Sequence, residues 1–143
     1  MDAGETALRV AHARVGRLAT VDREGRPHLV PFCFAAEGET IYSAVDAKPK
    51  HSQRLRRLEN IREHPSVSIL VDHYDEDWSR LWWVRLDGRA EVLEGGSERE
   101  RALRLLEEKY EQYRARRPDG PVIAVRVEGR RAWTANEKEG GER

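Results

Sequence analysis

The sequence has a single cysteine, Cys33, among its 143 residues. One cysteine cannot form a disulfide within the chain, and it cannot supply the cysteine set of a structural zinc site. Long apolar runs are also missing, since none approaches the roughly 18 residues that a membrane-spanning helix needs. Residues 1–16 lack the apolar segment of a secretory signal. We therefore expect a soluble cytoplasmic protein that does not act at a membrane.

Neither sign of charge is in excess, because 26 lysines and arginines balance 26 aspartates and glutamates. A protein that binds nucleic acid through its bulk charge needs a basic excess, so the composition argues against nucleic acid as a partner but allows a local basic patch. The length suits one domain with a modest core. We expect a single domain over residues 1–136 and a flexible polar tail over 137–143.

The sequence also lacks the motifs of self-contained catalysis. It contains no Walker loop, no G-x-G-x-x-G and no H-E-x-x-H, and Ser43 is not in a G-x-S-x-G elbow. Potential metal ligands gather in one stretch, at Asp72, His73, Asp75 and Asp77. We interpret this stretch as a solvated loop, and Cys33 as a small core residue rather than a nucleophile. We nominate no catalytic residue and no metal ligand, and expect a bound cofactor to carry the chemistry.

Short apolar runs separated by turn signals make up most of the chain. They cover 16–22, 27–36, 40–45, 66–72, 81–94 and 121–128, with a last short strand around Trp133. The run over 81–94 is one long strand or two strands joined at Asp87-Gly88, and Gly129 is expected to turn the chain between the last two. A spacing of about ten residues between such runs is typical of a β-meander.

Three segments have the apolar spacing of helices. They are 4–14, 52–63 and a segment that starts near Ser97 and is closed by Pro118-Asp119-Gly120. In the first, Leu8, Ala11 and Val15 are expected to share the buried side. Because the strands group together rather than alternate with helices, we predict a mainly β fold, an antiparallel barrel with flanking helices, and not a Rossmann fold.

The helix that starts near Ser97 has the clearest signals. Ser97 and Glu100 have the spacing of a capping box. Apolar residues recur on one face, at Leu103, Leu106, Tyr110 and Tyr113. Arginines follow at Arg114, Arg116 and Arg117, where positive charge suits the negative end of a helix dipole.

A candidate anion site follows the third strand, where Ser43 precedes Lys48 and Lys50 around a proline. The next residues enter a helix, and the N-terminus of a helix attracts anions. Lysine is a strong point charge for phosphate, and the Ser43 hydroxyl adds a donor. The alternatives are a phosphate-binding loop and a solvated basic loop.

Tryptophans form a second cluster, at Trp78, Trp82 and Trp83, with Arg85 close behind. Adjacent residues of a strand point to opposite faces, so only one of the last two tryptophans fills the barrel. The other covers a dimer interface or stacks on a planar ring system. Both interpretations hold together if a cofactor lies between two subunits.

The run LATVDREGRPHLVPFCFAAEGETIYSAVDAKPK, a helix, and then HPSVSILVDHYDEDW resemble the pyridoxamine-phosphate-oxidase-like superfamily. More narrowly, the chain resembles its F420-dependent oxidoreductases of actinobacterial type, over about residues 8–133. The resemblance implies a split β-barrel homodimer with two cofactor sites at the dimer interface. The cofactor is FMN in some branches of the superfamily and the deazaflavin F420 in others.

The resemblance also implies roles for particular residues. Lys48 and Lys50 would hold the phosphate, with Ser43 near the cofactor. The strand segment Val30, Pro31 and Phe32 would run along the ring system, and Trp78 would approach it. We add Trp83 to the candidate cofactor-binding residues from its place in the tryptophan cluster. Pro31 departs from this pattern because it removes a backbone donor. The connection over 51–63 is longer than the family often has, which weakens the transfer of roles to its arginines.

Four functions follow from these observations. The first is an F420-dependent oxidoreductase that transfers hydride between the deazaflavin and a small-molecule substrate, with Arg54, Arg56, Arg57 and Arg62 as partners for the acidic tail of F420. The second is an FMN-binding oxidoreductase of the same fold. The third is a non-catalytic carrier of F420 or flavin, and the fourth is a structural barrel dimer without a cofactor.

Overall fold

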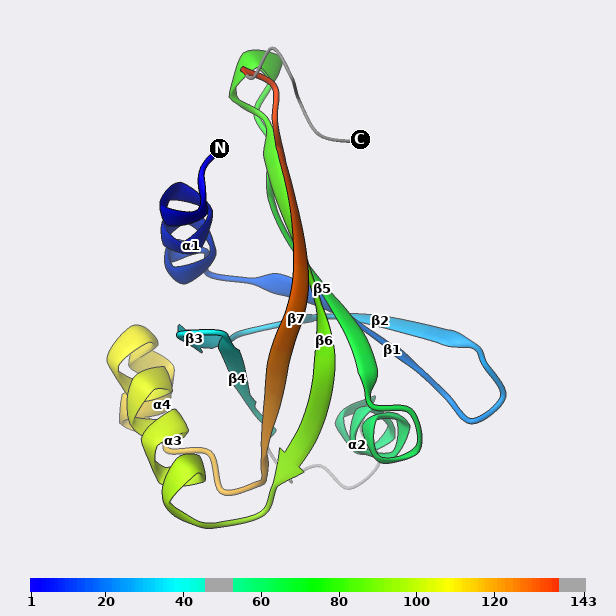
Figure 1. Cartoon of the computed structure of the whole chain (residues 1–143). Helices are drawn as coiled ribbons and strands as arrows, with labels where there is room; N and C mark the ends of the chain where they lie inside the picture. The colour runs from blue at the N-terminus through cyan, green and yellow to red at the C-terminus, as the bar shows by residue number, and fades with distance from the viewer. Residues whose placement is uncertain (46–52, 137–143) are drawn as a thin grey trace.

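A computed structural model describes residues 1–45 and 53–136 of the chain, and within α2 it describes side chains from residue 56 onward. Among these residues, seven strands form one antiparallel sheet in the order β2-β1-β5-β6-β7-β4-β3. The sheet curls into a half-barrel (Figure 1). The strands are β1 Gly16–Val21, β2 Pro27–Phe32, β3 Ala35–Glu37, β4 Thr40–Ala44, β5 Ser66–His73, β6 Trp82–Leu93 and β7 Val122–Thr134. The predicted antiparallel, mainly β fold is confirmed.

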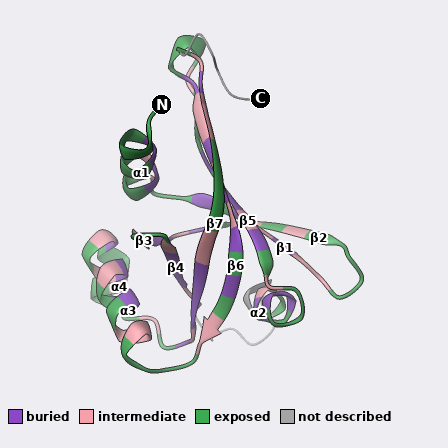
Figure 2. Cartoon of the chain, in the orientation of Figure 1, coloured by how far each residue is buried: buried purple, intermediate pink, exposed green. Residues whose placement is uncertain are grey.

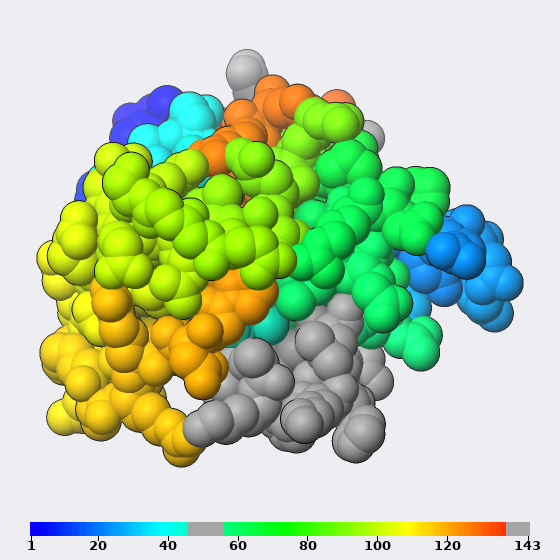
Figure 3. Space-filling model, turned by 90° about the horizontal axis from the view of Figure 1, so that it is seen from below, coloured from blue at the N-terminus to red at the C-terminus, as the bar shows by residue number. Residues whose placement is uncertain are grey.

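Helices flank this sheet. They are α1 Ala3–His12, α2 Gln53–Glu63, α3 Ser97–Lys109 and α4 Glu111–Ala115, with a short 3-10 helix η1 Trp78–Arg80 in the β5–β6 connection. Helix α2 packs on β1 and β6, while α3 packs on β3, β4 and β7. Figure 3, seen from below, shows the α3–α4 pair and the β1–β2 hairpin at opposite ends of the molecule. Within the described ranges, no helix has the length and apolar content to cross a membrane.

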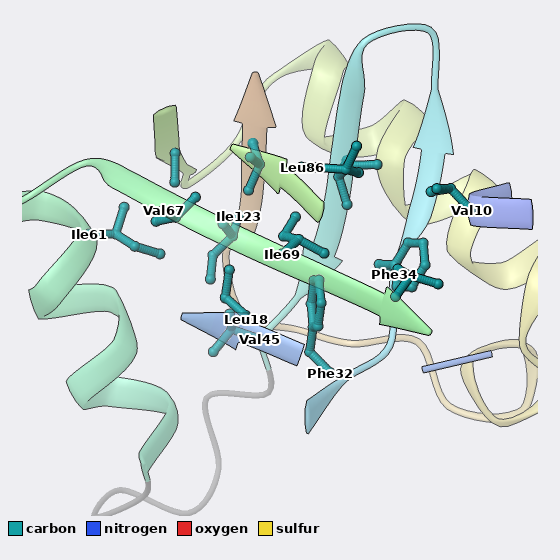
Figure 4. Close-up of a cluster of buried hydrophobic side chains, with 14 of the residues drawn as sticks. Val10, Leu18, Phe32, Phe34, Val45, Ile61, Val67, Ile69, Leu86 and Ile123 are labelled. Atoms are coloured by element: carbon teal, nitrogen blue, oxygen red, sulfur yellow. The ribbon is translucent and has the colours of Figure 1, made fainter. Parts of the chain in front are cut away.

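The core lies on the inner face of the half-barrel. Strand β5 shows how the sequence produces it, since Val67, Ile69 and Val71 are buried and alternate with more exposed residues. Leu18 and Ile123 join them from β1 and β7 (Figure 4). Burying a side chain of this size contributes about 1.5–3 kcal/mol. Figure 2 shows that β7 is buried where it begins and exposed along its middle, which agrees with the buried residues 122–125.

The first helix forms where predicted, but its buried face was predicted wrongly. Leu8 is 60% exposed and Val15 is 42% exposed, and Ala11 is also exposed. The buried residues of α1 are Thr6 and Val10, which lie four apart and share one face. At about 100° per residue, Leu8 points roughly 200° away from Thr6, and so faces away from the sheet.

The predicted third helix divides into α3 and α4 at Tyr110. The capping box is wrong, because Gly96 takes the N-cap position and no side chain caps the helix. Tyr110 leaves the helical conformation, and its buried hydroxyl accepts from the Phe34 N–H at 3.1 Å. Arg114 behaves as predicted at this end, since its Nη1 donates to the carbonyls of Glu107 and Glu108. Arg117 instead pairs with the carboxylates of Glu100 and Glu107.

Two of the predicted strands also differ from the structure. The run over 27–36 is broken after Phe32, so Cys33 lies between β2 and β3, half-buried as a free thiol beside Tyr110. Strands β6 and β7 are each continuous, and Gly129 does not turn the chain. Instead Asp87 pairs with Gly129 while Gly88 pairs with Val127, which leaves one extra residue on β7 as a bulge.

Candidate functional site

The predicted cofactor strand, β2, is an edge strand of the sheet. Val30 is half-buried and packs on the core, and Phe32 is buried with its ring 5.4 Å from that of Phe34. Pro31 lies on the opposite face and is exposed. Proline suits an edge strand because such a strand has backbone groups that pair with no neighbour. A ligand beside β2 would therefore meet backbone atoms along this edge.

Ser43 lies on β4, where it pairs with Ile123 of β7 and is only 3% exposed. It alternates with Tyr42, whose side chain packs against α3, so Ser43 points to the side of Ile41 and Val45 in the inner core. Lys48 and Lys50 follow within residues 46–52, which lie outside the described residues. Their role in holding phosphate stays a prediction.

The elements on both sides of residues 46–52 are fixed by buried or partly buried polar contacts. Tyr42 donates to Glu98 at 2.6 Å, and Glu98 also accepts from Arg126. These hydrogen bonds, from the Arg126 guanidinium first and the Tyr42 hydroxyl second, lower the pKa of Glu98 to about 2. On the other side, the buried Asn60 of α2 donates to the buried Thr20 hydroxyl at 3.1 Å. The end of β4 and helix α2 are therefore held in place on the sheet.

A second group of predicted residues lies at the far end of β5, β6 and β7. Here a cavity of about 450 Å³ opens on the outer face of the sheet. We call its aromatic and apolar lining the tryptophan surface, which consists of Leu70, Tyr74, Trp78, Leu81, Trp82, Trp83 and Trp133. Three polar residues complete the lining, namely Asp72, His73 and Arg85. Trp78 and Tyr74 are each 62% exposed, and the Trp78 indole N–H lies 3.4 Å from the Tyr74 hydroxyl. Ring-shaped ligands suit such a lining.

The two adjacent tryptophans point to opposite faces, as predicted. Trp82 packs on the core side, where the Arg9 guanidinium lies 5.1 Å from its ring centroid. Trp83 lies opposite Trp133 in the β6–β7 register, beside the cavity on the outer face. The His73 ring stacks on Trp82 with centroids 6.3 Å apart.

The acidic stretch before Trp78 forms a turn held by its own side chains. Asp77 accepts from the Ser79 hydroxyl at 2.7 Å and from the Ser79 N–H, and these bonds lower the pKa of Asp77. His73 lies 3.6 Å from Asp75. Across the part of the chain that the structure describes, no three His, Cys, Asp or Glu residues are grouped to hold a metal ion. Asp77 is thus the N-cap of η1, the short helix that begins at Trp78.

The two groups do not meet within one copy of the chain. Ser43 pairs with Ile123, which pairs with Val92, and Trp83 lies nine residues before Val92 on β6. At about 3.3 Å per residue, the two groups are separated by ~30 Å along the strand. Figure 1 places η1 at the top of the molecule and α2 near the bottom. A single ligand site that uses both groups needs a second copy.

Sequence reasoning missed two parts of the tryptophan surface that come from other strands. Trp133 reaches it because the β6–β7 register places it opposite Trp83, and Leu70 comes from β5. The sequence placed Trp133 on a strand. It did not show which residue of the neighbouring strand Trp133 would pair with, because the bulge at Gly88 shifts the pairing by one residue. Tyr74 had no signal beyond its place beside the acidic stretch.

Comparison with known proteins extends these observations. A family model described as pyridoxamine 5'-phosphate oxidase matches residues 4–134. A conserved hypothetical protein of Mycobacterium tuberculosis has 26% identity and a TM-score of 0.77, with 94% of this chain and 86% of that chain covered. No curated protein matches the sequence.

Two further solved structures have lower identity and indicate the fold alone. An FAD-binding protein of Mesorhizobium loti has 23% identity and a TM-score of 0.71, with 92% of this chain and 94% of that chain covered. The heme storage protein of Vibrio cholerae has 18% identity and a TM-score of 0.71, with coverages of 92% and 93%. The same half-barrel therefore occurs in proteins with different bound groups.

Proposed function

Because the chain belongs to the pyridoxamine 5'-phosphate oxidase family, we propose that it is an oxidoreductase that binds a flavin-type cofactor, and that this cofactor is F420. The observation that carries the proposal is the tryptophan surface beside a cavity of about 450 Å³. Cavities of this size with aromatic walls and few polar groups are typical ligand sites. The planar ring system of a flavin or deazaflavin fits such walls.

The site is completed between two copies in this proposal. Leu29 is 70% exposed and Leu70 is 36% exposed on the outer face of the sheet, and Trp78 is exposed at its end. Apolar groups that are exposed together on one face mark an association surface. In this proposal a homodimer through this face brings the tryptophan surface of one copy toward the β2 edge of the other. The Ser43 side chain is buried on the inner face, so the partner copy meets the β2 backbone rather than this hydroxyl.

The choice of F420 over FMN depends on positive charge near α2. F420 carries an acidic tail beyond its phosphate, and Arg56 is exposed on this helix. Arg62 already donates to Glu94 at 2.7 Å, so Arg56 is the better candidate partner for the tail. An exposed ion pair of this kind contributes little binding free energy by itself. Contacts with the tail would therefore add a small amount to the affinity that Lys48 and Lys50 provide by holding the phosphate.

The residues of this chain have three tasks in the proposed reaction. Lys48 and Lys50 hold the phosphate, the β2 edge at Val30, Pro31 and Phe32 orients the ring, and Trp78 and Trp83 cover it from the partner copy and exclude water. The cofactor supplies hydride transfer to or from a small-molecule substrate. Orientation and exclusion of water by the protein then account for most of the rate enhancement.

One titration series tests the cofactor and separates the alternatives. We expect colourless purified protein that quenches F420 fluorescence on titration and binds FMN more weakly. Yellow protein with flavin absorbance would favour FMN, and F420 binding without turnover across electron acceptors would favour a carrier. An absorbance change with hemin that His73→Ala abolishes would instead assign heme binding at the tryptophan surface. Protein that binds none of these would favour the structural barrel dimer without a cofactor.

A further inference from the structure

A second cavity lies on the inner side of the sheet, away from the tryptophan surface. It has a volume of about 360 Å³ and opens between helix α1 and the strands. The walls are apolar, formed by Ala7, Val10 and Ala11 of the helix and by Ile41, Leu86 and Val127 of the sheet. Ile41 and Leu86 belong to the inner core. The cavity is therefore an open groove, with a floor formed by core residues and an exposed α1 wall at Ala7 and Ala11.

The hollow arises from the way in which α1 sits on the sheet. Thr6 and Val10 are its buried residues, and the neighbouring wall positions Ala7 and Ala11 carry only a methyl group. An apolar ligand in this groove would gain van der Waals contacts with the groove floor and remove its apolar surface from water. Its volume falls within the range of small-molecule sites.

A charged group stands at the rim of this cavity. Arg130 of β7 lines the cavity with Glu39, and its Nη2 lies 2.6 Å from Glu39 Oε2. Both hydrogen bonds between these residues use Nη2. A guanidinium has five N–H donors, so Nε and Nη1 of Arg130 are able to meet an incoming anion. A ligand carboxylate would share this guanidinium with Glu39, which occupies Nη2, by accepting hydrogen bonds from Nε and Nη1.

We propose that this cavity binds a small amphiphilic carboxylate. Its apolar chain lies along Val10, Ile41 and Leu86, and its carboxylate pairs with Arg130. At about 30 Å³ per water-sized volume, the cavity holds about ten to twelve non-hydrogen atoms, which matches a medium-length alkyl chain with one carboxylate. The site is independent of the proposed cofactor site, because the two lie on opposite faces of the sheet.

Calorimetric titration of the full-length protein with octanoate, and separately with octanol, tests the proposal. We expect saturable octanoate binding and shifts of the Val10, Ile41 and Leu86 methyl signals in NMR spectra. Arg130→Gln should weaken octanoate binding at least about tenfold, since a charge-assisted pair is lost, and should leave octanol binding unchanged. Arg104→Gln, on the exposed side of α3, is the matched control and should bind octanoate as the wild type does.

A second pair of variants tests the location. Ala7→Leu fills the cavity from α1 and should abolish octanoate binding, while Ala3→Leu adds the same side chain to an exposed position of the same helix and should not. Equal binding by both variants, or no binding by the wild type at millimolar octanoate, would overturn the proposal. Shifts of the same methyl signals with protein concentration alone would also overturn it, because a second copy would then cover the cavity.

Discussion

At the scale of single residues, Lys48 and Lys50 carry the most specific prediction. Charge-assisted hydrogen bonds contribute about 1.5–3 kcal/mol each. The double variant Lys48→Ala/Lys50→Ala should therefore raise the dissociation constant for F420 at least about a hundredfold in a fluorescence titration. Arg116→Ala/Arg117→Ala, which removes two exposed cations at the end of α4 instead, is the control. An unchanged constant for the lysine variant would remove these residues from the site.

Lys109 offers a second residue-scale prediction that concerns stability. Its ammonium donates to the Phe34 carbonyl at 2.8 Å and lies 4.1 Å from the Phe34 ring centroid. Burial, assisted by the charge of Arg14, lowers the pKa of Lys109 to about 8. Because the folded state disfavours the charged amine, the unfolded chain binds more protons between pH 8 and the ordinary lysine pKa.

Stability should therefore rise with pH in this window. We expect the free energy of unfolding of the wild type to increase between pH 8 and 9.5 relative to that of Lys109→Met, as measured by urea denaturation. Above pH 10 the effect is opposed by Tyr110, because burial raises the pKa of its phenol to about 12. Parallel pH profiles of the two proteins below pH 9.5 would contradict the assignment.

At the scale of elements, the β6–β7 pair determines where the tryptophan surface lies. Its bulge requires a glycine at position 88, because a Cβ there would overlap the Arg126 carbonyl. Gly88→Ala should destabilise the fold by about 1–3 kcal/mol in chemical denaturation, since the backbone must shift. Gly95→Ala is the matched control, because a Cβ at Gly95 meets no atom within 4 Å and should change stability by less than about 0.5 kcal/mol.

The elements were also what the sequence predicted best. Alternation in 66–72 and turn signals after Val21 located the strands, because each strand has one buried face. Local patterns did not specify which face of α1 is buried. That face is decided by the side on which the helix packs against the sheet, and the apolar character of Leu8 does not determine it. They did not specify the contact of Trp83 with Trp133 either, because a register between distant strands depends on the bulge.

At the scale of the whole molecule, the separation between Ser43 and the tryptophan surface leads to a test of the dimer. In the proposed dimer, one copy supplies Lys48 and Lys50 to a site and the other copy supplies Trp83. Trp83→Ala and Lys48→Ala/Lys50→Ala therefore remove contacts that come from different copies. Neither variant alone should bind F420 tightly. A mixed dimer, however, has one site with both defects and one site with none.

Random exchange of equal amounts of the two variants gives mixed dimers as half of the population. We therefore expect tight F420 binding to return to about a quarter of the sites, as measured by fluorescence titration. Thermal unfolding of each variant serves as the control for folding, and sedimentation confirms exchange. If mixing restores no tight sites although exchange occurs, the site is contained within one copy.

The edge position of β2 has a further consequence. An open strand edge invites another polypeptide to extend the sheet, which is how ordered aggregates grow. Pro27 and Pro31 both lie on β2, and a proline has no amide hydrogen to offer an added strand. This edge can therefore stay accessible to a small ligand. A peptide strand from another molecule would find too few N–H donors on β2 to extend the sheet.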